Sequence, residues 1–410
     1  MSPRANVIEV NIELSEKGVN LVAVIGAGSM GHAIAQIMAM AGLEVTMTDV
    51  NREFMEKGYD RIKWSLEKFV EKRTIRQEEM DAALARIKLV DGYPNTVSNA
   101  DFVIEAAPED LDLKKKIFQD IDAHAPPRAI IASNTSTLSI TALGSATKRA
   151  EKVVGMHFFN PPQLMPLVEV VKGASTSDET AQTTLELAKK LGKTAVLVRK
   201  DVRGFIVNSV LGYVFNEAFW AMHRGEATRD QIDSAVKYKA GFPMGIFELA
   251  DFVGLDIIDS ASKQMASEYA DRVKVPPVVE PLVKAGKLGQ KSGEGFYNWK
   301  TGRPRIPFEL ADEFDVDRIY VTAINGAAWL VHEGVAVPED IDTAMKFGAG
   351  WPSGPCELGD RLGLDTVVAK LKELQTKLNE PSYKPCPLLE EYVSKGWTGR
   401  QSKRGFYTYA

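Results

Sequence analysis

Residues 20–31 read Asn-Leu-Val-Ala-Val-Ile-Gly-Ala-Gly-Ser-Met-Gly and determine the fold of the N-terminal half of the chain. The apolar run over 21–25 predicts a strand that is buried on both faces. The glycines that follow have the G-x-G-x-x-G spacing of a dinucleotide-binding βαβ unit. Gly26 allows a tight turn, Gly28 lets the backbone approach a pyrophosphate, and Gly31 lets the next helix pack close to the strand.

The segment after the glycines predicts the rest of this unit. A helix from about 30 to 41 offers its free N–H groups and the positive end of its dipole to phosphates. A second strand over 44–48 then ends at Asp49, 23 residues after Gly26. A carboxylate there accepts hydrogen bonds from an adenosine ribose and repels a 2′-phosphate, which favours NAD over NADP. The residues expected to bind the cofactor in this unit are Gly26, Gly28, Ser29, Met30, Gly31 and Asp49.

Composition narrows the class of protein. The 410 residues are 45% hydrophobic and 26% charged, which predicts a globular protein of two or three domains. The net charge of −5 gives no electrostatic reason to expect nucleic-acid binding. No apolar run reaches the roughly 18 residues of a membrane span, and the start lacks an apolar signal core, so we expect a cytoplasmic protein. Cys356 and Cys386 are expected to be buried, reduced thiols, and no metal site is expected.

An α/β alternation continues to about residue 200. Short apolar runs separated by helical or turn sequence predict further strands and a parallel sheet. These runs are 87–90, 102–105, 129–132, 153–156, 167–171 and 194–198. We therefore expect a Rossmann-like NAD-binding domain over residues 1–200. Helical patterns dominate after it.

The helical part contains an internal repeat. Trp220, His223 and Gly225 recur 109 residues later as Trp329, His332 and Gly334, and Gly254-Leu255-Asp256 recurs as Gly363-Leu364-Asp365. Near the end the offset becomes 110, where 295–297 matches 405–407. This register predicts two tandem all-α domains, a first copy over 201–300 and a second over 315–410, with a joint near 303–307.

His157 is the histidine best placed for chemistry. It directly follows the predicted strand 153–156, at the carboxyl edge of the sheet where open α/β folds bind ligands. Glu169 lies twelve residues later in the next strand, and a proline-rich turn between the two can bring their side chains together. A carboxylate beside an imidazole orients it and stabilises its protonated form. This spacing favours a His–Glu base.

Other polar residues are candidates for ligand contacts. Ser136 and Asn134 lie in a Ser-Asn-Thr-Ser-Thr run at the same edge, which suits either a helix cap or a polar ligand. Asn208 sits in the apolar start of the first long helix and needs a partner in the protein or a substrate. Lys57 belongs to a basic helical segment that either faces solvent or meets a phosphate-bearing ligand.

Together these stretches resemble the 3-hydroxyacyl-CoA dehydrogenase family. The resemblance covers about residues 20–300 and rests on the glycine motif, Ser133-Asn134-Thr135-Ser136, His157-Phe158-Phe159-Asn160-Pro161, Glu169-Val170, Gly204-Phe205-Ile206-Val207-Asn208 and Gly293-Glu294-Gly295-Phe296-Tyr297. The segment 315–410 resembles the extra C-terminal domain of fused fatty-acid-oxidation enzymes. Those chains often carry a hydratase as well, and none is found in these 410 residues.

The resemblance implies an (S)-3-hydroxyacyl-CoA dehydrogenase that uses NAD. The family's active-site set falls on Ser136, His157, Glu169 and Asn208. Ser136 and Asn208 are expected to contact the acyl-CoA, and Lys57 is expected there because of its basic segment. Positions that contact NAD in the family fall on Asp49, Glu109 and Lys114, and Asn134 is a further residue expected to bind the cofactor. The alternatives are a gulonate-type or other hydroxyacid dehydrogenase and a non-catalytic NAD-binding protein. We expect one active site per chain and a monomer in which the two copies imitate a dimer, with a homo-oligomer as the alternative.

Overall fold

An eight-stranded sheet organises the N-terminal part of the computed structural model, which describes residues 18–410. Residues 1–17 of the predicted first domain lie outside the described residues. The strands are β1 (Leu21–Ile25), β2 (Glu44–Thr48), β3 (Ile87–Leu89), β4 (Phe102–Glu105), β5 (Ile130–Ser133), β6 (Val153–Phe158), β7 (Leu167–Lys172) and β8 (Thr194–Val198). Their order across the sheet is β3-β2-β1-β4-β5-β6-β7-β8.

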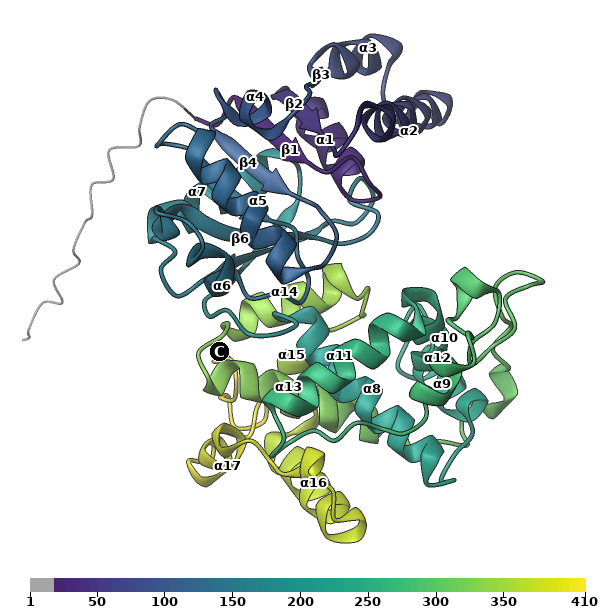
Figure 1. Ribbon diagram of the computed structural model, residues 1–410. Helices are drawn as coiled ribbons and strands as arrows, with labels where there is room; N and C mark the ends of the chain where they lie inside the picture. The colour runs from purple at the N-terminus through teal and green to yellow at the C-terminus, as the bar shows by residue number, and fades with distance from the viewer. Residues whose placement is uncertain (1–17) are drawn as a thin grey trace, which may run out of the picture.

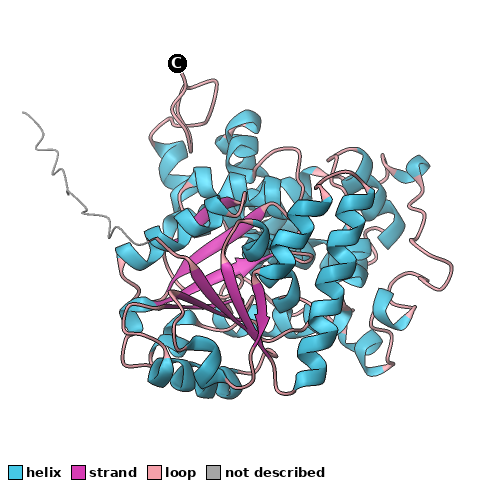
Figure 2. Ribbon diagram, turned by 90° about the horizontal axis from the view of Figure 1, so that it is seen from above, coloured by secondary structure: helices cyan, strands magenta, loops and turns pink. Residues whose placement is uncertain are grey.

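Helices cover both faces of this sheet (Figures 1 and 2). Val22 and Val24 of β1 belong to one core, with α1 (Gly31–Met40), whereas Ala23 and Ile25 belong to the other, with α5 (Leu111–His124). The strands are therefore apolar on both faces, as their uninterrupted apolar runs predict. The other helices of this part are α2 (Arg52–Glu71), α3 (Gln77–Ala85), α4 (Tyr93–Val97), α6 (Ile140–Gly144) and α7 (Asp178–Lys190), with a short 3-10 turn at Ala150–Lys152.

The expectation of a parallel sheet is wrong at one place. Strands β6 and β7 run antiparallel, whereas all other neighbouring pairs are parallel. The chain between them, 159–166, is too short for the crossover of a dozen or more residues that a parallel pair needs. Strand β6 also continues to Phe158, so His157 lies inside the strand rather than after it.

Ten helices form the C-terminal part of the described chain. They are α8 (Val207–His223), α9 (Arg229–Tyr238), α10 (Ile246–Val253), α11 (Leu255–Glu268), α12 (Glu280–Lys284), α13 (Asp317–His332), α14 (Pro338–Gly348), α15 (Pro355–Leu362), α16 (Leu364–Leu378) and α17 (Pro387–Ser394). Short 3-10 turns lie at Gln290–Ser292, Phe308–Leu310 and Pro381–Tyr383. Helices α8 and α13 pack against each other in the middle of this part (Figure 1).

A buried aspartate ties α9 to α10. Asp233 is 0% exposed and accepts hydrogen bonds from the backbone N–H groups of Phe247 (2.9 Å) and Glu248 (3.0 Å) at the start of α10. The hydroxyl of Tyr297 donates a third bond, at 2.9 Å. One side chain thus satisfies the open N-terminus of a helix and fixes the end of the segment that follows α12.

The same arrangement occurs between α14 and α15. Asp342 accepts the backbone N–H groups of Cys356 and Glu357, each at 2.8 Å, and the hydroxyl of Tyr407 at 2.7 Å. Asp251 and Asp360 form another matching pair, each accepting two backbone N–H groups from the last segment of its stretch. The stretches 204–299 and 313–409 therefore use buried carboxylates at corresponding places.

The buried carboxyl of Asp233 predicts a dependence of stability on pH. Burial raises its pKa to about 7, from about 3.9 in an unfolded chain. A carboxyl with a raised folded-state pKa contributes its full stability below the unfolded pKa and loses it as pH rises through the folded pKa. We expect the contribution of Asp233 to the free energy of unfolding to fall between about pH 4 and pH 7.

Urea unfolding at a series of pH values measures this effect. The Asp233→Asn variant has no ionisable group at this place, so the difference in stability between it and the unchanged chain should vary over that window. Substitution of the exposed Asp112 by asparagine is the control, and its difference should stay flat. A flat difference for Asp233→Asn as well would contradict the prediction.

Both cysteines are buried and free, as predicted. Among residues 18–410, no helix has the length and apolar character that crossing a membrane requires.

Candidate active site

The glycine loop between β1 and α1 has the geometry of a nucleotide site. Gly26 has a φ of +101°, and an added Cβ would lie 2.7 Å from the carbonyl oxygen of Ala106. A Cβ on Gly31 would lie 1.8 Å from the carbonyl oxygen of Gly26, so the helix packs directly on the turn. A Cβ on Gly28 would meet nothing within 4 Å, so the backbone borders open space there. These three environments are the ones that a pyrophosphate at this loop requires.

The start of α1 and the carboxylate of Asp49 complete the loop. Helix α1 has no side-chain cap and no acidic residue in its first turn, which leaves its N–H groups available to an anion. Asp49 follows β2 and accepts hydrogen bonds from the backbone N–H groups of Ala27 (2.6 Å) and Val50 (2.7 Å). The carboxylate is held at the edge of the loop, where an adenosine ribose binds in this type of unit.

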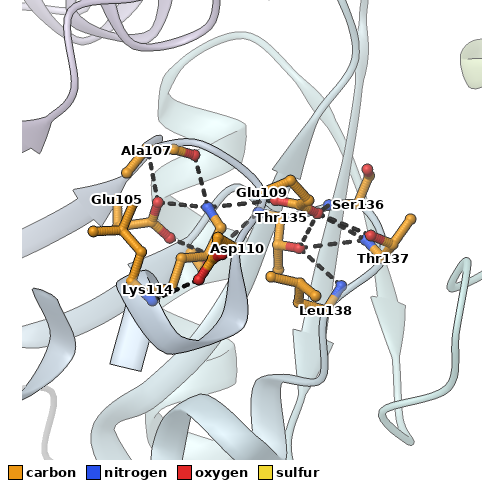
Figure 3. A network of polar contacts seen from close by, with 11 residues as sticks. Glu105, Ala107, Glu109, Asp110, Lys114, Thr135, Ser136, Thr137 and Leu138 are labelled. Atoms are coloured by element: carbon orange, nitrogen blue, oxygen red, sulfur yellow. Dashed lines mark hydrogen bonds and ion pairs between the residues drawn. The ribbon is translucent and has the colours of Figure 1, made fainter. Parts of the chain in front are cut away.

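A buried ion pair supports the neighbouring strand ends (Figure 3). The ammonium of Lys114, on α5, lies 2.6 Å from Oε1 of Glu105 and 2.9 Å from the carbonyl oxygen of Ala107. Glu105 and Lys114 are 0% and 1% exposed, and Ser133 donates to the other oxygen of Glu105 at 2.6 Å. Because Lys114 is enclosed by these groups, its predicted contact with NAD stays a prediction.

Glu109 extends this network to the Ser-Asn-Thr-Ser-Thr segment (Figure 3). Its Oε1 accepts hydrogen bonds from the hydroxyls of Thr135 (2.5 Å) and Thr137 (3.0 Å) and from the backbone N–H of Ser136 (3.2 Å). Although burial raises the pKa of the Glu109 carboxyl, the Lys114 ammonium and the hydroxyls together hold it below its usual value. A carboxylate thus fixes the loop that carries Ser136.

The side chains of His157 and Glu169 meet as predicted, and the pairing of two strands, in addition to the turn between them, holds them together. They are directly opposed residues in the antiparallel ladder of β6 and β7, and His157 Nδ1 lies 2.7 Å from Glu169 Oε2. The residue is 6% exposed, and its imidazole packs against the rings of Phe159 and Phe205, with centroids 4.7 and 5.6 Å away. Because a carboxylate accepts, Nδ1 carries the proton and Nε2 is the basic nitrogen.

The other oxygen of Glu169 holds the start of α8. Its Oε1 accepts the backbone N–H groups of Ile206 and Val207, both at 3.0 Å. The carboxylate is 0% exposed, and the first turn of a helix is a favourable place for such a charge. One buried side chain therefore orients the imidazole and joins the sheet to the helical part.

The remaining predicted residues are placed as follows. Ser136 and Asn208 are half-buried at the loop after β5 and in the first turn of α8, next to the segments that Glu109 and Glu169 hold. Asn134 uses its Oδ1 to accept the backbone N–H of Phe158 at 2.9 Å, which ties β5 to the end of β6. Lys57 is exposed on α2 and pairs with Glu53 at 2.6 Å, so in this structure its charge already has a partner.

The sequence reasoning missed the buried pair of Glu105 and Lys114 as a structural unit. The sequence does indicate a buried charge here, because Glu105 ends the apolar run Phe-Val-Ile-Glu, and a charge at such a position is rarely buried without a partner. The partner nine residues later cannot be read from sequence alone, since it comes from a helix that packs back on the strand.

Two family models match the chain. The one described as "3-hydroxyacyl-CoA dehydrogenase, NAD binding domain" matches residues 21–202. The one described as "3-hydroxyacyl-CoA dehydrogenase, C-terminal domain" matches 204–299 and 313–409.

Individual proteins agree with these matches. A probable 3-hydroxybutyryl-CoA dehydrogenase of Bacillus subtilis is 42% identical over 68% of this chain and 97% of its own length. A fatty acid oxidation complex subunit alpha of Idiomarina loihiensis is 34% identical over 92% of this chain, which spans only 56% of that relative. The crystal structure of a 3-hydroxybutyryl-CoA dehydrogenase from Escherichia coli K12 aligns over 93% of this chain and all of its own, with a TM-score of 0.87 and 29% identity.

Proposed function

Because the chain belongs to the 3-hydroxyacyl-CoA dehydrogenase family, we propose that it interconverts (S)-3-hydroxyacyl-CoA and 3-oxoacyl-CoA with NAD. The observation that carries the proposal is the buried pair of His157 in β6 and Glu169 in β7, whose carboxylate also holds the start of α8. The glycine loop with Asp49 supplies a nucleotide site in the same sheet. When bound, NAD supplies the acceptor for the hydride from C3 of the substrate.

His157 is proposed as the general base. Its Nε2 takes the proton of the 3-hydroxyl group in the oxidation and returns it in the reduction. Glu169 keeps Nδ1 protonated and offsets the positive charge that the imidazole gains. Ser136 and Asn208 are proposed to hold the hydroxyl and thioester oxygens, because both lie half-buried in segments that carboxylates fix.

Cofactor contacts are proposed on the residues named from the sequence. The loop over Gly26 to Gly31 would bind the pyrophosphate and Asp49 the adenosine ribose. Glu109, Lys114 and Asn134 are proposed at the nicotinamide side, where Glu109 and Asn134 border the loop after β5. Lys57 is proposed to meet a CoA phosphate, which would have to displace Glu53 from it.

An absorbance assay of NADH with acetoacetyl-CoA tests the proposed activity. Oxidation of NADH that depends on the acyl-CoA, compared over several chain lengths, supports it and gives the preferred acyl group. Free hydroxyacids such as gulonate serve as the comparison, and turnover of these with no turnover of acyl-CoA would replace the proposal by a hydroxyacid dehydrogenase. The absence of turnover with both classes would favour a non-catalytic NAD-binding protein.

Cofactor choice gives a separate prediction. The unchanged protein should prefer NADH strongly over NADPH, because the carboxylate of Asp49 repels a 2′-phosphate. The Asp49→Ala variant should narrow the ratio of kcat/KM values for the two cofactors. Asp110→Ala, at the cap of α5, is the matched control and should leave this ratio unchanged. Equal use of both cofactors by the unchanged protein would contradict the assignment.

We also propose that 201–300 and 315–410 are tandem copies related by a two-fold axis. The matching carboxylate contacts of Asp233 and Asp342 support this relation. The contacts between the stretches are reciprocal as well. A Cβ on Gly241 would lie 3.6 Å from Pro352, and one on Gly350 would lie 3.2 Å from Pro243, which is the same pair of positions exchanged. Such self-complementary contacts are characteristic of an isologous dimer interface.

The second copy is proposed to have no active site of its own. The residue 109 positions after Asn208 is Asp317, which would place a negative charge where the first copy has a neutral amide. Cys356 and His332 are proposed to be structural, and so is Trp351, whose ring stacks on Phe242 at 4.3 Å. A monomer in the cytoplasm stays a prediction.

A further inference from the structure

Helix α14 brings the second helical stretch onto the sheet. Figure 1 shows it between the sheet and the other helices, and it packs against β7 and β8. Just before it, Val335 accepts the backbone N–H of Arg199 at 2.7 Å, and the carbonyl of Glu333 accepts the ammonium of Lys200. The stretch therefore lies beside the strand that carries Glu169.

Gly348, the last residue of α14, lies close to β7 and to the start of α8. A methyl group built on it would lie 2.6 Å from Cδ2 of Leu167, 2.9 Å from Cγ2 of Val207 and 3.5 Å from Cζ of Phe159. The first two distances are shorter than carbon atoms tolerate. As the structure stands, any side chain at this position would have to push its neighbours away.

Those three neighbours surround the pair of His157 and Glu169. Leu167 begins β7, two residues before Glu169. Val207 donates its backbone N–H to Glu169 Oε1 at 3.0 Å. Phe159 packs its ring on the imidazole of His157, with centroids 4.7 Å apart. Gly348 is thus separated from the pair by a single layer of side chains.

The helix itself does not require glycine at this position. The residue 109 positions earlier is Lys239, just after α9, whose exposed ammonium pairs with Asp312 at 2.7 Å. A glycine in a helix is less favourable than alanine because its backbone has more freedom to lose. The contact with Leu167 and Val207 is the feature that explains a glycine at 348 and a lysine at 239.

We propose that Gly348 is a positioning residue for the His157–Glu169 pair. In this proposal the second helical stretch, 313–409, packs against the side chains that surround the pair and so forms part of the active site. This inference rests on the proposed function for the reaction that the pair serves. A side chain at 348 moves Phe159 and the start of α8, and with them the imidazole and the carboxylate that orients it. The second stretch then acts on catalysis in addition to completing the fold.

The Gly348→Ala variant tests this role in the full-length chain. We expect kcat to fall about 10- to 100-fold, because small displacements of reacting groups have effects of this size. The Kd for NADH should stay within about twofold, since the glycine loop is not involved. The pH profile of kcat/KM should shift, because the environment of the base changes.

Gly359→Ala is the matched control. It adds a methyl to the same helical stretch, 3.1 Å from Ile324 and Leu364, away from the catalytic pair. It should keep the kcat and pH profile of the unchanged chain. If Gly348→Ala lowered kcat no more than Gly359→Ala does, and with no shift of the profile, the positioning role would be wrong.

The pKa of His157, followed by NMR without substrate, gives a readout that is independent of turnover. The resonance is assigned by its loss in His157→Gln. Its pKa should change in Gly348→Ala and not in Gly359→Ala, whatever the substrate proves to be. If Gly348→Ala does not fold, the double variant Gly348→Ala/Leu167→Ala removes the atom nearest to the new methyl and keeps the contacts with Val207 and Phe159. An unchanged His157 pKa in the folded variant would overturn the inference.

Discussion

The His157→Gln enzyme should lose about 10²- to 10⁴-fold in kcat while it binds NAD as the unchanged chain does. The imidazole is the proposed general base, and glutamine cannot accept a proton at neutral pH. The nucleotide loop lies on β1 and α1, away from β6, so cofactor affinity should not change. Stopped-flow or steady-state oxidation of NADH with acetoacetyl-CoA measures kcat, and the fluorescence of bound NADH measures affinity.

His124→Gln is the matched control for this prediction. His124 ends α5, where its Nδ1 lies 2.8 Å from the carbonyl oxygen of Asp120, and it is exposed. Its loss should leave kcat unchanged. A His157→Gln enzyme with near-normal kcat would remove His157 from the role of base, whereas loss of NADH binding in this variant would indicate a wider structural effect.

A chain that ends at residue 300 should aggregate or dimerise. Its truncation removes α13 from the apolar side of α8 and α14 from β7 and β8. It also removes Arg318 and Tyr383, the partners of the carboxyl of Glu217, which is 2% exposed in the full chain. Exposed apolar surface of this kind is covered by self-association or leads to aggregation.

Light scattering coupled to size-exclusion chromatography distinguishes the outcomes, with the full chain as the reference. Dimerisation through 201–300 would support the proposal that the second copy takes the place of a partner subunit. Aggregation also follows from the loss of a large apolar contact. A truncated chain that stays monomeric and as stable as the full chain in urea would refute the internal dimer.

The stability test on Asp233 and the cofactor test on Asp49 probe separate parts of the molecule. Asp233 reports on the helical stretch and does not touch the nucleotide loop. Asp49 reports on the loop, where its carboxylate accepts hydrogen bonds from the backbone N–H groups of Ala27 and Val50. Failure of one of these tests therefore leaves the other standing.

Local patterns were sufficient for the nucleotide loop. The conformation of residues 21–31 can be predicted from the segment itself, because strand burial, glycine conformation and helix packing there all depend on residues close in sequence. The pairing of His157 with Glu169 was predictable for a similar reason. Twelve residues with a proline-rich centre leave few routes for the chain, and the structure makes the two direct partners in a ladder.

The direction of β7 was not predictable from the same patterns. A strand that is buried on both faces has the same apolar sequence pattern whether it runs parallel or antiparallel to its neighbour. The short connection over 159–166 allows only an antiparallel pair if β7 lies next to β6. That β7 takes this position in the sheet is seen only in the structure.

The sequence by itself determined the two-part organisation, the glycine loop and the residues proposed to bind the cofactor there, the repeat at an offset of 109 residues and the residues of the proposed active site. Only the tertiary structure decided that Lys114 pairs with the buried Glu105 and that Glu169 accepts hydrogen bonds from the start of α8. It also decided that Gly348 packs against the side chains around His157. The physical reason is the range of the interactions. Periodicity and turn chemistry act between near neighbours in the chain, whereas buried ion pairs and close packing join segments that meet only when the chain has folded.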